Sequence, residues 1–137
     1  MDFTLHFRVA HSYAGEPLGI GVPVVLSRAR RRLRTLAKID TGADVCVFKR
    51  EHGEDLQIDI DSGLPLQIAT ATGSFLAYGH HLSVATLGFD CEALVYFAFA
   101  HDFPRNVLGR RGWLEQMRLG LVDYDRKIYL ARYGDEG

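Results

Sequence analysis

The sequence predicts an all-β domain, a barrel or a sandwich, formed by many short strands and one late helix. Along most of the chain, apolar and polar residues alternate with a period of two, which is typical of half-buried strands. Turn residues separate these segments, and a helical spacing of apolar residues is convincing in only one place. With 137 residues and no internal repeat or linker, residues 1–137 are expected to form a single domain.

The first half of the chain is expected to contain four strands. Residues 3–9 alternate apolar and polar side chains, which predicts a half-buried strand. Residues 20–27 and 33–39 are predicted to pair as a hairpin with a run of arginines at its turn. Residues 45–48 form a short apolar strand, and residues 49–55 are interpreted as a charged turn or a single helical turn.

A second hairpin and a buried strand are expected in the next part of the chain. Residues 64–71 and 75–87 are predicted to pair around a tip formed by Thr72–Ser74. Residues 93–100 are an uninterrupted apolar run. This run is too short for a membrane span and is typical of a strand buried on both faces.

The single helix is predicted at residues 112–119. Trp113 and Met117 lie on one face at this spacing, and Gly120 stands where a C′ glycine ends a helix. Residues 120–130 are then expected to form a closing hairpin.

Composition and charge exclude several classes of protein. The formal net charge is −1, so no whole-molecule field attracts nucleic acid or anionic lipid. Cys46 and Cys91 can form at most one bridge, too few for a disulfide scaffold. The N-terminus lacks the features of a signal peptide, and residues 62–89, although uncharged apart from histidine, are too polar to span a bilayer. We therefore expect a soluble, cytoplasmic protein without a membrane partner.

The sharpest local feature is the segment Asp40-Thr41-Gly42-Ala43-Asp44, which lies between two apolar strands. Such a segment presents the Asp40 carboxylate on a tight loop. Gly42 allows a sharp turn or the close approach of a ligand, and the Thr41 hydroxyl is expected to brace the loop by hydrogen bonds. The tripeptide alone is a weak signal, and the flanking strands strengthen it.

A second segment, Asn106 to Arg110, places two apolar residues and Gly109 just before the expected helix. In order, spacing and context, Asp40-Thr41-Gly42-Ala43 and Val107-Leu108-Gly109-Arg110 resemble segments of the retropepsin-like aspartic proteases, the single-domain relatives of pepsin. In that family, an Asp-Thr-Gly-Ala loop is matched further along by an apolar-apolar-Gly segment that leads into a short helix. The resemblance covers about residues 18–130.

The resemblance implies a closed β-barrel of the acid-protease type, with one short C-terminal helix and a flap hairpin over the site. The residues expected at the flap are Thr72, Gly73, Ser74 and Phe75. In retroviral members, an Asp directly after the Ala pairs with the Arg that follows the second Gly. Asp44 and Arg110 hold these positions, so the resemblance implies a supporting ion pair.

The resemblance also implies an aspartic endopeptidase with Asp40 as its catalytic residue, acting on a peptide or protein substrate. Peptide hydrolysis needs one carboxylate that accepts the proton of the attacking water and a second, protonated one that polarises the carbonyl group. Two carboxyls about 3 Å apart share one proton and titrate as a unit. The chain has one suitable loop, so the second Asp40 is expected from another copy in a homodimer.

Three other readings remain open. One keeps the retropepsin fold as a catalytically idle module for peptide binding or dimerisation. Another concerns Asp61-Ser62-Gly63, which we interpret as a turn because too few residues separate it from the flap. If this segment were a second catalytic loop, a monomer would be active. The third is a nucleic-acid binder that uses the arginine run.

The arginine run and the histidines are interpreted without a cofactor. Five arginines lie within residues 28–34, where a solvated turn is favoured over a phosphate-binding site. The six histidines and two cysteines lack the spacings of a zinc site, so neither a metal nor an organic cofactor is expected. Cys46 and Cys91 are interpreted as buried thiols.

Overall fold

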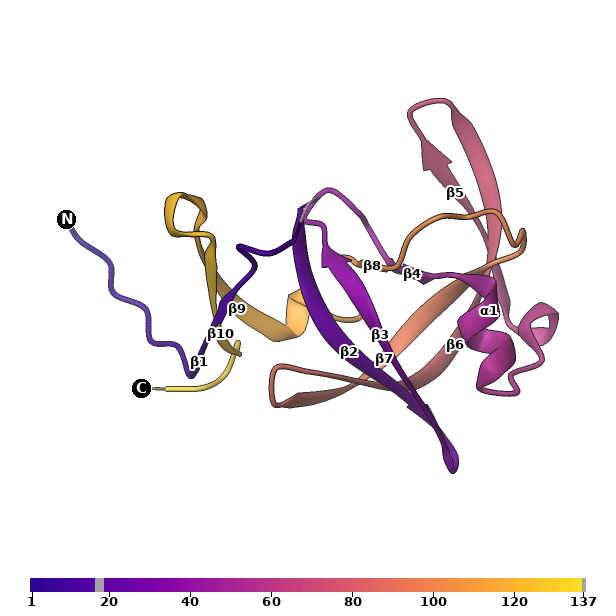
Figure 1. Cartoon of the computed structure of the whole chain (residues 1–137), viewed down its shortest axis with the longest axis horizontal. Coiled ribbons are helices and arrows are strands. Elements are labelled where there is room, and N and C mark those ends of the chain that lie inside the picture. Colours follow the sequence, from indigo (N-terminus) through magenta and orange to yellow (C-terminus); the bar gives the residue numbers. More distant parts are fainter. Residues whose placement is uncertain (17–18, 137) are drawn as a thin grey trace.

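The computed structural model describes residues 1–16 and 19–136, and position 18, where the resemblance begins, lies outside them. The chain is mostly β, with a closed six-stranded barrel, one short α-helix and a separate three-stranded sheet (Figure 1). The expectation of an all-β barrel is confirmed at this level. Within the described residues, no helix has the length and apolar character that a membrane crossing requires.

The elements follow one another in simple order along the chain. The strands are β1 (Val9–Ser12), β2 (Ile20–Arg28), β3 (Arg31–Ile39), β4 (Cys46–Phe48), β5 (Leu64–Thr70), β6 (Gly73–Thr86), β7 (Phe89–Ala98), β8 (Val107–Leu108), β9 (Met117–Val122) and β10 (Lys127–Arg132). The helix α1 spans Arg50–Asp55, and single 3₁₀ turns lie at Ile60–Ser62, Leu114–Gln116 and Asp123–Asp125.

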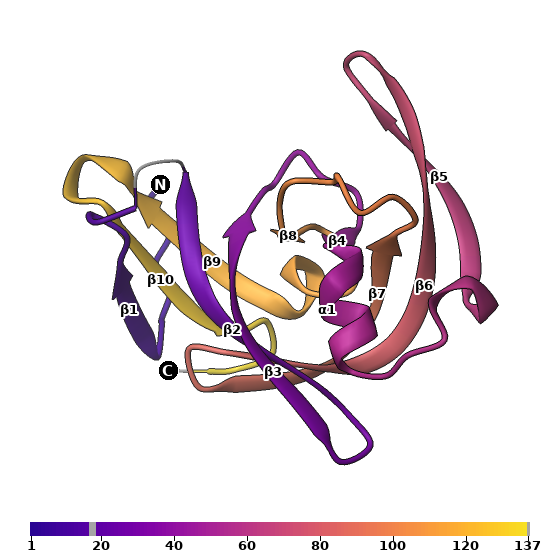
Figure 2. The same cartoon turned by 45° about the vertical axis from the view of Figure 1, so that its right-hand side comes forward.

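The barrel closes because β2 pairs with strands on both of its sides. The strand order is β2-β3-β8-β4-β7-β6, and a second pairing of β2 with β6 completes the ring. The two-residue strand β8 lies between β3, to which it is parallel, and β4, to which it is antiparallel. Strand β5 pairs with β6 outside the ring, so the β5–β6 hairpin rises beyond the barrel (Figure 2).

The interior is filled by alternate side chains of the barrel strands, as the period of two predicts. The residues with the smallest exposure include Leu26, Phe48, Val84, Phe97 and Leu108, all at 0%. The separate sheet β1-β10-β9 packs its buried Ile128 and Leu130 into the same core cluster. One continuous core therefore joins the two sheets.

The three predicted hairpins are present. They are β2–β3, β5–β6 and β9–β10, with ends that differ from the prediction by a few residues. The buried strand predicted at residues 93–100 is β7, which begins earlier, at Phe89. Residues 49–55 were interpreted as either a charged turn or a single helical turn, and helix α1 lies in this segment.

The predicted N-terminal strand at residues 3–9 is wrong. The first strand, β1, begins only at Val9, and the side chains of Phe3 and Leu5 are 87% and 61% exposed. Alternation alone does not supply a partner strand for this segment. The packed residues of the segment are at its end, where Val9 contacts the core and the Phe7 ring lies 6.0 Å from that of Tyr129 between centroids.

The predicted C-terminal helix at residues 112–119 is also wrong. This segment contains one 3₁₀ turn, and β9 begins directly after it at Met117. Trp113 and Met117 are buried, as their spacing suggested, but pairing of β9 with β10 replaces a helical continuation. Gly120 lies opposite Tyr129 within this ladder and does not cap a helix.

The barrel core makes a direct prediction about stability. Replacing Phe97 by Ala removes a ring with 0% exposure, and we expect the free energy of unfolding to fall by about 3–5 kcal/mol. The matched control is Tyr124→Ala, at a side chain that is 97% exposed, with an expected change below about 0.5 kcal/mol. Urea unfolding of both variants tests this, and equal losses would contradict the described core.

Candidate active site

The loop at residues 40–45, called the site loop from this point, connects β3 to β4 and presents the Asp40 carboxyl. The amide of Asp40 donates to the carbonyl of Leu108 in β8 at 3.0 Å. The amide of Gly42 donates to Asp40 Oδ1 at 2.8 Å, and the amide of Ala43 donates to the Asp40 carbonyl at 3.2 Å. The half-buried carboxyl is therefore held at the end of its strand by its own loop.

Gly109 permits the chain after β8 to lie directly against the site loop. A Cβ atom at this position would lie 2.2 Å from the carbonyl oxygen of Val45 and 2.8 Å from that of Ala43. The next amide, of Arg110, donates to the Ala43 carbonyl at 2.9 Å, and that of Arg111 donates to the Asp44 carbonyl at 2.9 Å. The two segments that the sequence singled out are therefore joined by backbone hydrogen bonds.

Asn106 fixes the other end of β8. Its buried side chain donates to the Leu36 carbonyl at 2.9 Å and to Thr35 Oγ1 at 3.1 Å, and its Oδ1 accepts from the Lys49 amide at 3.0 Å. Its own carbonyl accepts from the Lys38 amide at 2.9 Å. One amide side chain thus connects β3, the entry to β8 and the end of β4.

His52 of α1 joins this network, which the sequence analysis did not predict. Its Nε2 lies 3.1 Å from Asn106 Nδ2 and 3.3 Å from Thr35 Oγ1. Because the amide nitrogen of Asn106 can only donate and has two hydrogens for three contacts, His52 Nε2 accepts a hydrogen that is shared with Thr35 Oγ1. Nδ1 of His52 is buried without a hydrogen-bond partner, and burial lowers the pKa of His52 below its usual value.

A cavity of about 450 Å³ lies between the site loop and β5. It is lined by Asp40, Gly42, Ala43, Asp44, Val45, Val47, Leu66, Gln67, Ile68, Ala69 and Arg111. A carboxylate, a flexible cation and apolar side chains therefore meet in one hollow. The sequence analysis identified the carboxylate but not the β5 and Arg111 walls, which come from positions distant in the chain.

The predicted flap is only partly assembled over this cavity. Strand β5 of the hairpin lines it, whereas the predicted tip residues Thr72, Gly73, Ser74 and Phe75 do not. The tip projects past the barrel (Figures 1 and 2), and the Phe75 ring stacks on that of Phe103 at 4.8 Å. The structure thus places the β5 strand, rather than the glycine tip, beside Asp40.

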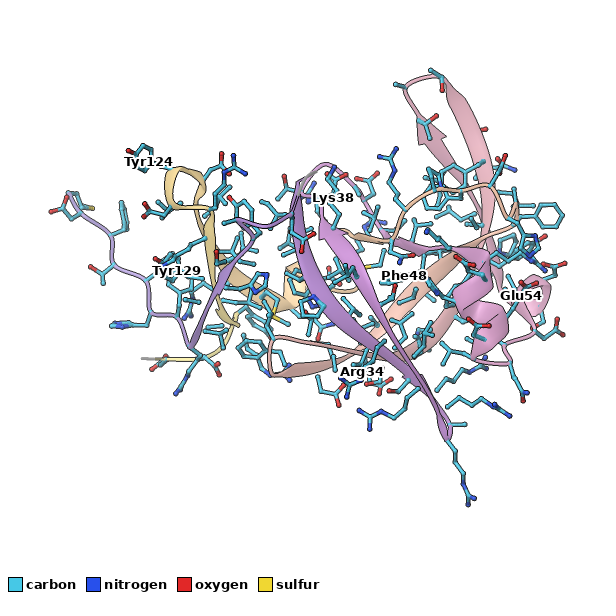
Figure 3. All side chains as sticks on the ribbon, in the orientation of Figure 1. Arg34, Lys38, Phe48, Glu54, Tyr124 and Tyr129 are labelled. Carbon is cyan, nitrogen blue, oxygen red and sulfur yellow. The ribbon has the colours of Figure 1, made fainter. Side chains whose placement is uncertain are left out.

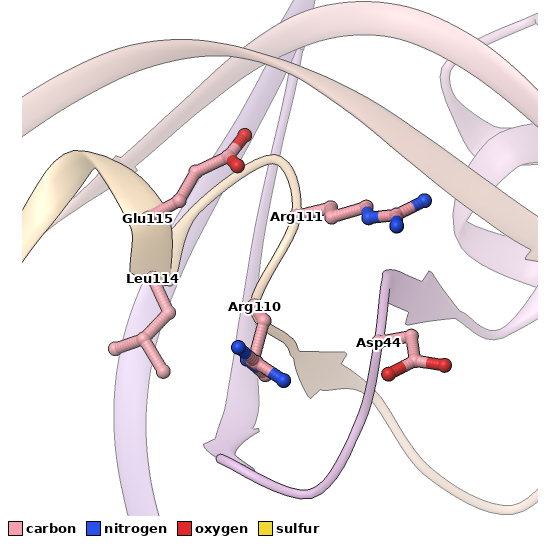
Figure 4. A pocket seen from close by; sticks show the side chains of 5 residues that line it. All are labelled: Asp44, Arg110, Arg111, Leu114 and Glu115. Carbon is pink, nitrogen blue, oxygen red and sulfur yellow. The ribbon is translucent and has the colours of Figure 1, made fainter.

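The predicted ion pair between Asp44 and Arg110 is absent. Among the described residues, no charged atoms of these two side chains come within 4.0 Å of each other. Both line a second hollow of about 300 Å³ with Arg111, Leu114 and Glu115 (Figure 4). Both are exposed, so little electrostatic energy favours holding them together.

The Thr41 hydroxyl does not brace the loop as predicted. Thr41 is exposed, and within the described part of the chain its side chain makes no hydrogen bond. The bracing comes instead from the amides of Gly42 and Ala43 and from β8.

The remaining predictions concern a turn and two thiols. Asp61 lies in a 3₁₀ turn and accepts from Arg50 at 3.0 Å, away from the residues that line the Asp40 cavity, so the turn interpretation is confirmed. Cys46 and Cys91 are free and buried, as predicted. Burial raises the pKa of Cys46 to about 11, so this thiol stays protonated. In residues 1–16 and 19–136, no cluster of three metal-binding side chains occurs.

The comparisons with known proteins leave the family of the chain open. Neither the family models nor the curated proteins give a match to it. A functional conclusion therefore depends on the geometry of the site.

Gly109 gives a prediction that tests how the site loop is held. We expect Gly109→Ala to lower the free energy of unfolding by about 1–3 kcal/mol, because the added methyl group meets two backbone carbonyls that cannot move independently. The control is Gly15→Ala, where the new Cβ has no atom within 4 Å. Urea unfolding measures both variants. An unchanged free energy of unfolding in Gly109→Ala would contradict the described contact.

His52 gives a prediction about pH. Its folded-state pKa lies below its unfolded value, so its contribution to stability is present above the unfolded pKa of about 6.5 and is lost as the pH falls toward the folded value. We expect the free energy of unfolding to drop more between pH 7 and pH 5 in the wild type than in His52→Gln. His81→Gln, at an exposed histidine, is the control and should retain the wild-type slope. Parallel slopes for all three proteins would refute a buried neutral His52.

Proposed function

We propose that the chain is an aspartic endopeptidase of the retropepsin type that acts as a homodimer. The observation that carries the proposal is the Asp40 carboxyl. It stands at the end of a barrel strand, is oriented by the Gly42 amide and opens on a cavity of about 450 Å³. The resemblance of the 40–43 and 107–110 segments to that family supports the same conclusion.

One chain supplies half of the required chemistry. In the described part of the chain, Asp40 hydrogen-bonds to no other carboxyl, so it has no partner with which to share a proton. Thr41 and Gly42 beside it are exposed, which leaves this end of the barrel accessible to a second copy. A two-fold axis through the site brings two Asp40 carboxyls together, so that they hold one proton between them.

The dyad then hydrolyses a peptide bond with a balanced set of proton transfers. The ionised Asp40 takes a proton from water, whose oxygen bonds to the carbonyl carbon, while the protonated Asp40 gives its proton to the carbonyl oxygen. When the tetrahedral intermediate collapses, one of its two hydroxyl groups returns its proton to the ionised Asp40 and becomes the new carbonyl group, the C–N bond breaks, and the amine leaves with the proton of the protonated Asp40. The products are a carboxylic acid and an amine, and the dyad again holds one proton.

The outer edge of β5 supports a peptide as the substrate. Among the described strands, β5 pairs only with β6, so the backbone groups of its other edge are unpaired beside the cavity. An extended peptide binds such an edge by adding a strand, with its side chains alternating between pockets. Val47, Leu66 and Ile68 offer apolar walls for these side chains.

The decisive substitution is Asp40→Asn, which removes the titrating group but keeps the size of the side chain. We expect peptide cleavage to fall at least about 1,000-fold, because neither proton transfer remains. The matched control, Asp61→Asn, changes the other Asp-Ser-Gly segment and should retain activity. Cleavage of a peptide library, followed by mass spectrometry, measures both. Turnover that survives in a purified Asp40→Asn dimer would overturn the mechanism.

A mixing experiment tests the contribution of the second copy. Adding excess Asp40→Asn chain to wild type should suppress cleavage, because mixed dimers contain only one intact Asp40. An idle peptide-binding module would instead bind peptides without products, and Asp40→Asn would not change that binding.

A further inference from the structure

The tip of the β2–β3 hairpin, residues 28–34, is a strongly positive surface. It carries Arg28, Arg30, Arg31, Arg32 and Arg34, and all five are exposed. Within the described residues, none of them forms an ion pair within 4.0 Å. The whole hairpin, Ile20–Ile39, contains neither Asp nor Glu. Its positive charge is therefore uncompensated by its own strands.

The register of the hairpin increases the repulsion. Arg28 lies directly opposite Arg31, and like charges at opposed positions destabilise a strand pair. A polyanion that binds the tip removes this repulsion, since it places negative charge between the two guanidinium groups. Relief of the repulsion between Arg28 and Arg31 therefore favours anion binding at the tip.

The arginines occupy both faces of the ribbon. Because side chains alternate along a strand, Arg28 and Arg31 lie on one face, and Arg32 and Arg34 lie on the other. Arg30 stands in the turn between the strands. An acidic protein surface contacts one face of such a ribbon, whereas a nucleic-acid groove has phosphates along both of its walls. Arginines on both faces therefore favour a nucleic-acid groove over an acidic protein surface as the binding partner.

The dimensions agree with the major groove of B-form DNA. Strand β2 pairs with β6 as far as Ser27, so the part that projects beyond this pairing contains the Arg28–Arg31 pair and a two-residue turn, with Arg32, opposite Ser27, at its base. With a rise of roughly 3.3 Å per residue, this part extends about 7 Å beyond the β2–β6 pairing. The major groove is about 8.5 Å deep and admits a two-stranded ribbon.

We propose that the tip of the β2–β3 hairpin binds the phosphate backbone of duplex DNA, as a second site separate from the proposed peptidase site. Figure 3 shows Arg34 toward the tip and Lys38 toward the opposite end of β3. The nine residues of β3 separate Arg31 from Asp40 by about 30 Å along the strand. The inference does not depend on the proposed proteolysis, and its test uses a different readout.

The experiment measures fluorescence anisotropy of a labelled 20-base-pair duplex between 50 and 200 mM salt. The wild type should bind, with an affinity that falls steeply as salt rises. Arg28→Ser with Arg32→Ser removes one arginine from each face. We expect this variant to lose affinity roughly tenfold or more and to reduce the salt slope by about two.

Two further variants separate the site from general charge and from misfolding. Arg105→Ser with Lys127→Ser removes two exposed positive charges elsewhere and should bind like wild type. Arg28→Lys with Arg32→Lys keeps the charge and should stay within a few fold of wild type. Asp40→Asn should bind DNA normally, while the Arg28 and Arg32 serine variant should still cleave peptide if the proposed function holds.

Competitor ligands decide between the classes of partner. Duplex DNA should compete better than double-stranded RNA, whose major groove is too narrow for side chains to enter, and better than poly-glutamate. The proposal is overturned if poly-glutamate competes as well as duplex DNA. It is also overturned if the wild type shows no saturable binding at 50 mM salt. The arginines would then serve only to prevent another strand from pairing with β3.

Discussion

The contact of Gly109 with the carbonyls of Ala43 and Val45 is the constraint on which both the barrel and the site depend. Strand β8 has only two residues, yet it alone connects β3 to β4 and so completes that side of the ring. It can lie there because no side chain at Gly109 separates it from the site loop. The same insertion supplies the Leu108 carbonyl that holds the Asp40 amide. The insertion of β8 therefore both closes the barrel and places the Asp40 carboxyl.

The site is supported by backbone groups and neutral side chains rather than by ion pairs. The Asn106 side chain hydrogen-bonds to a backbone carbonyl, a backbone amide and Thr35, and burial lowers the pKa of the neighbouring His52. Buried hydrogen bonds of this kind are costly to leave unmade, whereas an exposed ion pair, such as the one expected between Asp44 and Arg110 and not formed, would contribute little. The loop geometry is thus largely independent of salt.

The sequence predicted what is encoded locally. The three hairpins follow from alternating side chains and turn residues, and the Asp40 loop follows from a glycine after an apolar strand. The exposed segment before Val9 and the 3₁₀ turn at Leu114–Gln116 were mistaken because periodicity does not specify the partner of a segment. His52 was missed for a related reason, since its burial arises from contacts with β3 and with Asn106, far along the chain.

Strand β3 carries the two charged features of the molecule at its opposite ends, and their separation decides whether one influences the other. Along β3, Arg31 lies about 30 Å from Asp40 and Arg34 about 20 Å, which is about three and two Debye lengths at 0.1 M salt, where the screening length is about 10 Å. At that salt the field of the arginines is therefore largely screened where it reaches Asp40. The two proposed ligands, a polyanion at the tip and a peptide beside Asp40, are therefore expected to bind independently, and each feature requires its own explanation.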